Sequence, residues 1–264
     1  MKLTKHCCNE STHFPAKMYN CESYAHDAAS YVSDPASLDH IISITPTSIN
    51  VKDTTVHDIL ITDHKPISCR VNGVPIVSWN IEGLCTDGSR LDAVKNKIRK
   101  FISKGFIIII QELFLQDKLR SLSQDEINIL TVARMRTIFG VDSHSVRISD
   151  GYTGAMYIPT IYYDKKPLSI KRINSNKQCL VLYINCKNPF YLVNMHLKST
   201  PLTLMGKRQH YKEVLNILSV LHEKKILSVG AIFMGDHNRI TIEKIYDRAL
   251  QTVKQNKTRR RKRV

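Results

Sequence analysis

A carboxylate and an amide stand two residues apart at the end of a strongly apolar segment. Residues 229 to 234 are almost entirely apolar, which predicts a buried strand, and Gly235, Asp236 and Asn238 follow at its end. Residues two apart in an extended chain lie on one face, so these two side chains could together grip a hydrated metal ion and a phosphoryl oxygen. Gly-Asp-x-Asn also forms ordinary turns, so the motif indicates a site only in combination with other strand ends.

Four other apolar segments end in groups of the same kind. These groups are Asn80, Glu112, His196 and the pair Asp63-His64. Oxygen ligands such as Glu112 and Asp63 suit Mg²⁺ or Mn²⁺, which bind through one or two carboxylates and the substrate phosphate. Zinc is disfavoured because the sequence contains neither a Cys-x-x-Cys pair nor a three-histidine arrangement.

The elements that must position these groups are apolar strands interleaved with a few amphipathic helices. We expect strands at residues 38–44, 67–71, 74–80, 106–112, 151–158, 160–163, 168–173, 179–185, 190–196 and 229–235. We expect helices at 91–103, in part of 119–139, at 206–222 and at 241–253. This pattern predicts an α/β protein in which two packed sheets are flanked by helices, as a single domain over residues 1 to 253 with residues 1 to 36 mostly loop.

The dipeptide Asn72-Gly73 separates two of these apolar runs. Asn-Gly between apolar segments is the strongest short-range hairpin signal, because both turn residues must adopt a positive φ. We therefore expect the strands at 67–71 and 74–80 to be antiparallel neighbours.

The charge of the chain predicts a polyanionic partner. The formal net charge is +16, which favours nucleic acid first and an anionic membrane surface second. No run of 18 apolar residues is present, so no membrane-spanning segment is expected. Residues 254 to 264 form a basic tail, expected to be flexible and to serve either as a nuclear-import signal or as a phosphate-binding arm. Seven cysteines without framework spacing suit a reducing compartment, so we expect an intracellular protein, with the nucleus as one location.

Five short motifs resemble those of the endonuclease/exonuclease/phosphatase superfamily, and they cover about residues 37 to 245. The motifs are Thr62–His64, Ser78–Leu84, Gln111–Glu112, Asn194–Leu197 and Gly235–Asn238. The resemblance implies a four-layer α/β/β/α sandwich of two mixed sheets and a phosphoesterase that uses Mg²⁺ or Mn²⁺. Within the superfamily, the motifs are most similar to those of the tyrosyl-DNA phosphodiesterase type 2 branch.

The order of the motifs predicts a circular permutation. In the superfamily, the Asp-His motif and the Asp of a preceding Leu-Asp-x-Ile strand come last in the chain, whereas here Asp39 and Asp63-His64 come first. The first and last strands of the family fold are neighbours in one sheet. A two-residue turn at Asn72-Gly73 could therefore join them without distortion.

The resemblance also implies a role for each motif residue. Glu112 would ligate the metal, with Asn80 and Asp63 supporting the same site. Asp236 would orient the attacking water and Asn238 the phosphate, while His64 and His196 would donate hydrogen bonds to phosphate oxygens. Asp39 would fix the tautomer of His64, and substrate contacts would come from Ser199, Arg208 and Arg239. Either Asp236 or His64 could accept the proton of the water.

These observations predict an Mg²⁺-dependent phosphodiesterase acting on nucleic-acid ends, with 5′-tyrosyl adducts of DNA or RNA among the candidate substrates. One alternative is a general DNA or RNA endonuclease. Another is a catalytically inactive nucleic-acid-binding module of the same fold. A lipid or inositol phosphatase is less favoured, because no membrane segment accompanies the positive charge.

Overall fold

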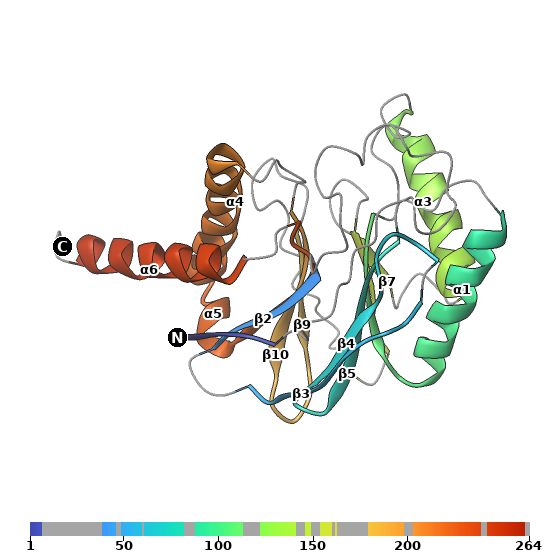
Figure 1. Ribbon diagram of the computed structural model, residues 1–264, viewed down its shortest axis with the longest axis horizontal. Coiled ribbons are helices and arrows are strands. Elements are labelled where there is room, and N and C mark those ends of the chain that lie inside the picture. The colour runs from blue at the N-terminus through green and yellow to red at the C-terminus, as the bar shows by residue number, and fades with distance from the viewer. Residues whose placement is uncertain are drawn as a thin grey trace.

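Two β-sheets pack face to face between two layers of helices in the computed structural model (Figure 1). The structure describes residues 1–6, 39–45, 49–59, 61–81, 88–112, 122–140, 146–148, 154–159, 162, 179–197, 203–238 and 242–261. The four-layer α/β/β/α arrangement expected from the sequence is confirmed.

The first sheet, called here the β11 sheet, has five strands. In spatial order they are β1 (Lys2–Lys5), β2 (Asp39–Thr45), β11 (Ala231–Asp236), β10 (Phe190–His196) and β9 (Cys179–Ile184). β10 and β11 are parallel and the other pairs are antiparallel, so the sheet is mixed.

The second sheet, called the β5 sheet, has six strands. Their order is β3 (Val51–Val56), β4 (Ile67–Val71), β5 (Val74–Asn80), β6 (Ile107–Gln111), β8 (Gly154–Tyr157) and β7 (Val146–Ile148). Only β5 and β6 are parallel. β4 and β5 form the expected hairpin, with φ of 50° at Asn72 and 88° at Gly73. The circular permutation that this hairpin would permit stays a prediction.

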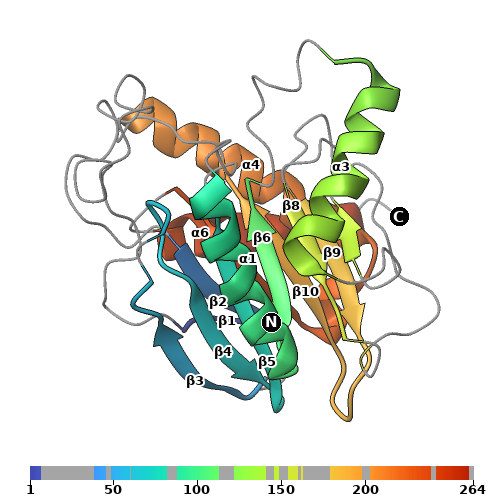
Figure 2. The same ribbon diagram turned by 90° about the vertical axis from the view of Figure 1, so that its right-hand side faces the viewer.

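Helices cover the outer face of each sheet. α1 (Gly88–Ser103) and α3 (Gln124–Phe139) lie on the β5 sheet, and Figure 2 shows α1 in front of it. α4 (Leu204–Glu223), α5 (Ile226–Val229) and α6 (Ile242–Arg261) lie on the β11 sheet. No helix among the described residues is both long and apolar enough to cross a membrane.

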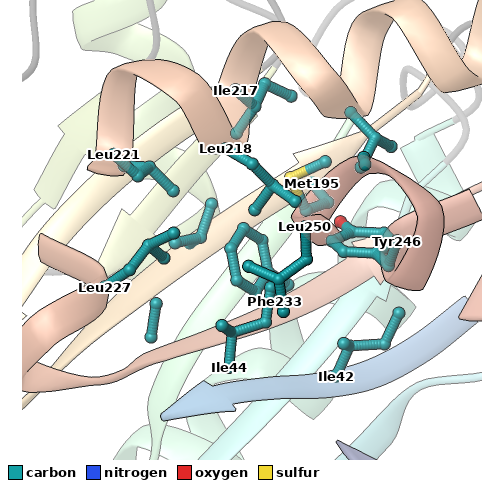
Figure 3. Close-up of a cluster of buried hydrophobic side chains, with 14 of the residues drawn as sticks. Ile42, Ile44, Met195, Ile217, Leu218, Leu221, Leu227, Phe233, Tyr246 and Leu250 are labelled. Carbon is teal, nitrogen blue, oxygen red and sulfur yellow. The ribbon is translucent and has the colours of Figure 1, made fainter. Parts of the chain in front are cut away.

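The alternation of side chains along each strand divides the apolar residues between layers. On β11, Phe233 packs with Tyr246 and Leu250 of α6 in the outer core shown in Figure 3. Its neighbours Ile232 and Met234 lie in the core between the sheets. The same period of two places Asp236 on the inter-sheet side, at the end of that core.

Several boundaries differ from those expected. β1 lies in the segment expected to be loop, paired with β2 in the register Leu3↔Ile44. Val229 belongs to α5 and is 42% exposed, because the strand begins only after Gly230, whose φ is 127°. β7 was not expected. The expected strands at 160–163 and 168–173 lie outside the described residues, Tyr162 apart.

The last helix is also longer than expected. α6 runs Ile242–Arg261 rather than 241 to 253, so most of the basic tail is helical where an irregular arm was expected. No Gly or Pro interrupts this segment, and its Lys, Arg and Gln residues are good helix formers.

Candidate active site

The polar strand ends converge at one end of the core between the sheets. Strand pairing aligns Asp236 of β11 with His196 of β10 on one side and with Asp39 of β2 on the other. In the facing sheet, Asn80 ends β5 beside Gln111 of β6. Asn80 donates a hydrogen bond from Nδ2 to Oδ2 of Asp236 at 3.2 Å, which joins the two sheets.

Glu112 reaches this cluster through an uncommon backbone conformation. Simple alternation after Gln111 would send the Glu112 side chain toward the helical layer. Instead, its φ is 52°, in the left-handed region that few non-glycine residues adopt. Its Oε1 accepts a hydrogen bond from Asn80 at 3.0 Å and pairs with Nε2 of His196 at 3.2 Å. A strained residue at such a position is typical of functional sites.

Asp236 is buried and held by three hydrogen bonds. Its Oδ1 accepts from the backbone N–H of Asn238 at 2.7 Å, and its Oδ2 accepts from Nδ2 of Asn238 at 2.9 Å and from Asn80. Asn238 also donates to the carbonyl of Leu197 at 2.7 Å. These contacts fix the orientation of the carboxylate from both sides.

His64 lies against the same carboxylate. Its Nδ1 donates to Oδ2 of Asp39 at 2.8 Å, and its Nε2 lies 3.9 Å from Oδ2 of Asp236 and 4.0 Å from Oδ1 of Asp63. Asp39 therefore makes the tautomer-fixing contact expected from the sequence, with Nε2 directed toward the cluster.

The segment that carries Asp63 and His64 is anchored by two residues to which the sequence assigned no role. Nε1 of Trp79 donates to the carbonyl of His64 at 2.9 Å and to Oγ1 of Thr62 at 3.0 Å. Oγ1 of Thr62 in turn donates to the carbonyl of His64 at 2.8 Å. The only signal for this role was the place of both residues inside motifs, because the partners lie in different strands and segments.

Burial and the surrounding charges shift the pKa values of the acidic groups in opposite directions. Burial raises the pKa of Asp236 to about 6, with the charge of Asp39 adding to the rise and His64 and His196 opposing it. Burial also acts to raise the pKa of Glu112, but the hydrogen bond and charge of His196 outweigh it and lower that pKa to about 2. Two carboxylates with such different pKa values suit one ligand and one proton acceptor.

Neighbouring carboxylates raise the pKa of both histidines. Burial alone would lower the pKa of His64, but the charges of Asp39, Asp63 and Asp236 raise it well above its usual range. His196 is also disfavoured by burial, and its pKa is raised by the hydrogen bond and charge of Glu112. The raised pKa of each imidazole favours its doubly protonated form, in which both ring nitrogens donate hydrogen bonds.

The donor set fits a divalent cation. Ligand atoms of Glu112, His196 and Asp236 lie within 4.8 Å of one another, as do those of Asp39, His64 and Asp236. In the second group, Asp39 and His64 are already joined by a buried hydrogen bond, so they are less available to a cation. In the first group Glu112 is ionised and partly exposed, so it can ligate without losing a proton.

The structure does not bring every expected site residue to the cluster. Asn80 joins Glu112 and Asp236 through its amide nitrogen, so its role as a metal ligand stays a prediction. Arg208 is exposed in the second turn of α4 and stays a predicted substrate contact. Ser199 and Arg239 lie outside the described residues.

Gly235 is required where β11 passes close to β10. Its φ is 136°, and a Cβ at this position would lie 2.1 Å from the carbonyl oxygen of Met195. We expect Gly235→Ala to lower the free energy of unfolding by about 3 kcal/mol or more, through overpacking and strain. Urea unfolding measures this, with Gly73→Ala as control. The Gly73 site has a positive φ but open space, so about 1 kcal/mol is expected there. Equal losses of unfolding free energy in the two variants would contradict a destabilisation that comes from the close approach at Gly235.

His237 faces away from the cluster and is fully buried. Its Nδ1 donates to the carbonyl of Gly235 at 2.8 Å, and its ring lies against those of His40 and Tyr246. Burial, reinforced by the charge of His40, lowers its pKa to about 3.

This low pKa predicts a loss of stability in acid. The unfolded chain binds a proton at His237 below about pH 6.5 and the folded chain does not, so stability falls as pH decreases from 6.5 toward 3. Between pH 7 and pH 5 the loss from this group is about 2 kcal/mol. Urea unfolding of His237→Phe at both pH values should show a drop smaller by that amount. A drop equal to that of the unsubstituted protein would contradict the assignment.

The fold and the site together define an α/β/β/α sandwich with a carboxylate–histidine cluster at one end of its central core. Three similar solved structures are two of TDP2 from Caenorhabditis elegans and one of a humanized TDP2 from D. rerio. Their identities to this chain are 21%, 20% and 16%, with TM-scores of 0.42, 0.42 and 0.39.

Each of these similarities covers 64% of this chain. In the same order, they cover 63%, 48% and 64% of the other three chains, so this chain spans less than two thirds of their length. A scan of family models and a search of curated proteins find no match. The four-layer fold that the motif resemblance implies is seen in the sheets and helical layers of the chain itself.

Proposed function

We propose that the chain is an Mg²⁺-dependent phosphodiesterase that hydrolyses phosphodiester bonds at nucleic-acid ends. The observation that carries the proposal is the convergence of Asp236, Glu112, His64 and His196 at one end of the inter-sheet core, from strands and segments far apart in the sequence. The net charge of +16 favours a nucleic-acid substrate.

Glu112 would hold the cation, with Asp63 as a further carboxylate near the same centre. When bound, the cation would neutralise a phosphate oxygen and stabilise charge on the leaving oxygen. Mg²⁺ and Mn²⁺ suit these oxygen donors better than zinc does.

The side chains divide the remaining chemistry. Asp236, oriented by Asn80 and Asn238, accepts the proton of the attacking water, and its pKa of about 6 suits a general base. His64 is unsuited to this step because its raised pKa keeps it protonated. His64 and His196 instead donate hydrogen bonds to the non-bridging phosphate oxygens, where negative charge grows in the transition state.

A panel of substrates tests this function. Purified protein is given 5′-tyrosyl DNA, 5′-tyrosyl RNA, abasic duplex, poly(A) or inositol phosphates, each with Mg²⁺, with Mn²⁺ or with EDTA. We expect hydrolysis of one or more nucleic acids that depends on the cation. Turnover of inositol phosphates alone would contradict the proposal, and nucleic-acid binding without hydrolysis would favour the inactive module.

The basic residues near the end of the sequence give a prediction about substrate affinity. Six basic residues lie between positions 257 and 263. If they bind phosphates, replacing all six with glutamine should reduce the salt dependence of nucleic-acid binding by up to about 5 units of slope, at about 0.9 per phosphate. Glutamine preserves helix propensity, so circular dichroism serves as the control. An unchanged slope would leave only the import-signal interpretation.

A further inference from the structure

Below the candidate site, a buried amide lies where all four functional strand ends meet. Gln111 ends β6 and is completely buried. Its Nε2 donates to Oδ1 of Asn194 at 2.7 Å, across to the other sheet, and to Oγ of Ser78 at 3.1 Å within its own sheet. The same nitrogen lies 2.8 Å from where a Cβ of Gly235 would stand.

Each of these neighbours precedes a functional residue by one or two positions. Ser78 comes two residues before Asn80, and Asn194 two before His196. Gly235 directly precedes Asp236, and Gln111 itself directly precedes Glu112. The Gln111 side chain, itself at the end of β6, thus bonds residues near the ends of β5 and β10 and lies close to Gly235 near the end of β11.

Asn194 completes the link between the sheets. It is 97% buried, and its Nδ2 donates to the carbonyl of Ile110 at 2.8 Å and, more weakly, to that of Ala155 at 3.4 Å. The core below this point is apolar and includes residues such as Met234 and Ile109. Apolar contacts are non-directional and fix the separation of two sheets better than their register, whereas a hydrogen bond of 2.7 Å fixes both.

We propose that Gln111, through its hydrogen bond to Asn194, is a positioning residue that sets the distance between Glu112, the cation-binding carboxylate of the β5 sheet, and Asp236 and His196 of the opposite sheet. The proposal rests on the proposed function, because it assigns these groups a common reaction. Displacing reacting groups by about 1 Å can cost 10²-fold in rate, so the register of the two sheets is directly a determinant of turnover.

The test compares Gln111→Leu with a matched core variant. We expect Gln111→Leu to lower kcat by about 10- to 100-fold, to change the substrate KM by less than about twofold, and to weaken Mn²⁺ binding by about 10-fold or more. Phe190→Leu removes volume from the same inter-sheet core at the opposite end of β10 and should leave kcat and Mn²⁺ affinity unchanged. If Gln111→Leu and Phe190→Leu lose equal activity at equal unfolding midpoints, Gln111 only fills space and the proposal is overturned.

A reciprocal exchange keeps the test decisive if Gln111→Leu does not fold. Gln111→Asn shortens one amide by a methylene group and should lower kcat. Adding Asn194→Gln restores the combined reach, so the double variant should recover at least about a third of the lost activity on a logarithmic scale. No recovery in a folded double variant would overturn the proposal.

Mn²⁺ binding separates this proposal from the proposed function. If no substrate is hydrolysed but Gln111→Leu weakens Mn²⁺ binding and Phe190→Leu does not, the positioning role stands for the metal site and the proposed function falls. If the unsubstituted protein neither binds Mn²⁺ nor hydrolyses any substrate, both are overturned.

Discussion

Asp236→Asn should lower kcat on the hydrolysed nucleic acid by about 10³-fold, the loss expected when a positioned general base is removed. The amide has nearly the shape of the carboxylate but cannot accept the proton of the attacking water. Substrate binding should persist, since the basic surface is unchanged. Turnover and filter binding on the same preparation measure the two effects separately.

Stability distinguishes this result from a loss of fold. Asp236→Asn removes a buried charge, which favours the folded state, and disturbs three hydrogen bonds, which disfavours it. The two effects oppose, so the unfolding free energy in EDTA should change far less than the activity. Asp247→Asn makes the same chemical change on α6, where Asp247 accepts a hydrogen bond from Gln251, and should retain full activity. More than a tenth of the activity in Asp236→Asn would contradict its role as the base.

The positions of the chemical groups were predictable because they follow from the strand pattern. Apolar runs ending in Asn80, Glu112, His196 and Asp236 predict strands whose ends carry function, and the period of two assigns most of these side chains to one face. The Asn72-Gly73 turn was equally local, since its conformation depends on two residues.

Features that depend on contacts between distant segments could not be predicted. The left-handed φ of Glu112 breaks the strand period at the point where the side chain must turn back toward Asn80. The anchoring of the His64 segment by Trp79 and the bond between Gln111 and Asn194 depend on which strands face each other. Sequence periodicity carries no information about such partners, because it describes one element at a time.

The boundaries of α6 illustrate a different limit. Its apolar period ends at Val253, and a basic run without apolar residues predicted loss of structure. Backbone propensity nevertheless continues the helix for two further turns beyond the core. A break in the apolar pattern therefore marks the end of burial and not the end of the helix.

His64 should act together with Asp39, so their substitutions should not be additive. His64→Gln removes a cationic hydrogen-bond donor aimed at the phosphate and should lower kcat by about 10² to 10³-fold. Asp39→Asn leaves the imidazole in place but removes the hydrogen bond of 2.8 Å that orients it. The double variant should therefore be little slower than His64→Gln, because the hydrogen bond of Asp39 acts through that ring and only its charge beside Asp236 acts separately. Fully additive losses would contradict this coupling.

The pH profile of Asp39→Asn provides the sharper test of the same pair. Asp39 is the carboxylate that contributes most to raising the pKa of His64, so its loss lowers that pKa. Activity needs the protonated ring, and the decline of kcat on the alkaline side should therefore begin at a lower pH in the variant. His222→Gln, in the last turn of α4 at the far end of that helix, should leave both the rate and the profile unchanged. An alkaline limb that stays in place in Asp39→Asn would mean that His64 does not donate to the phosphate in its charged form.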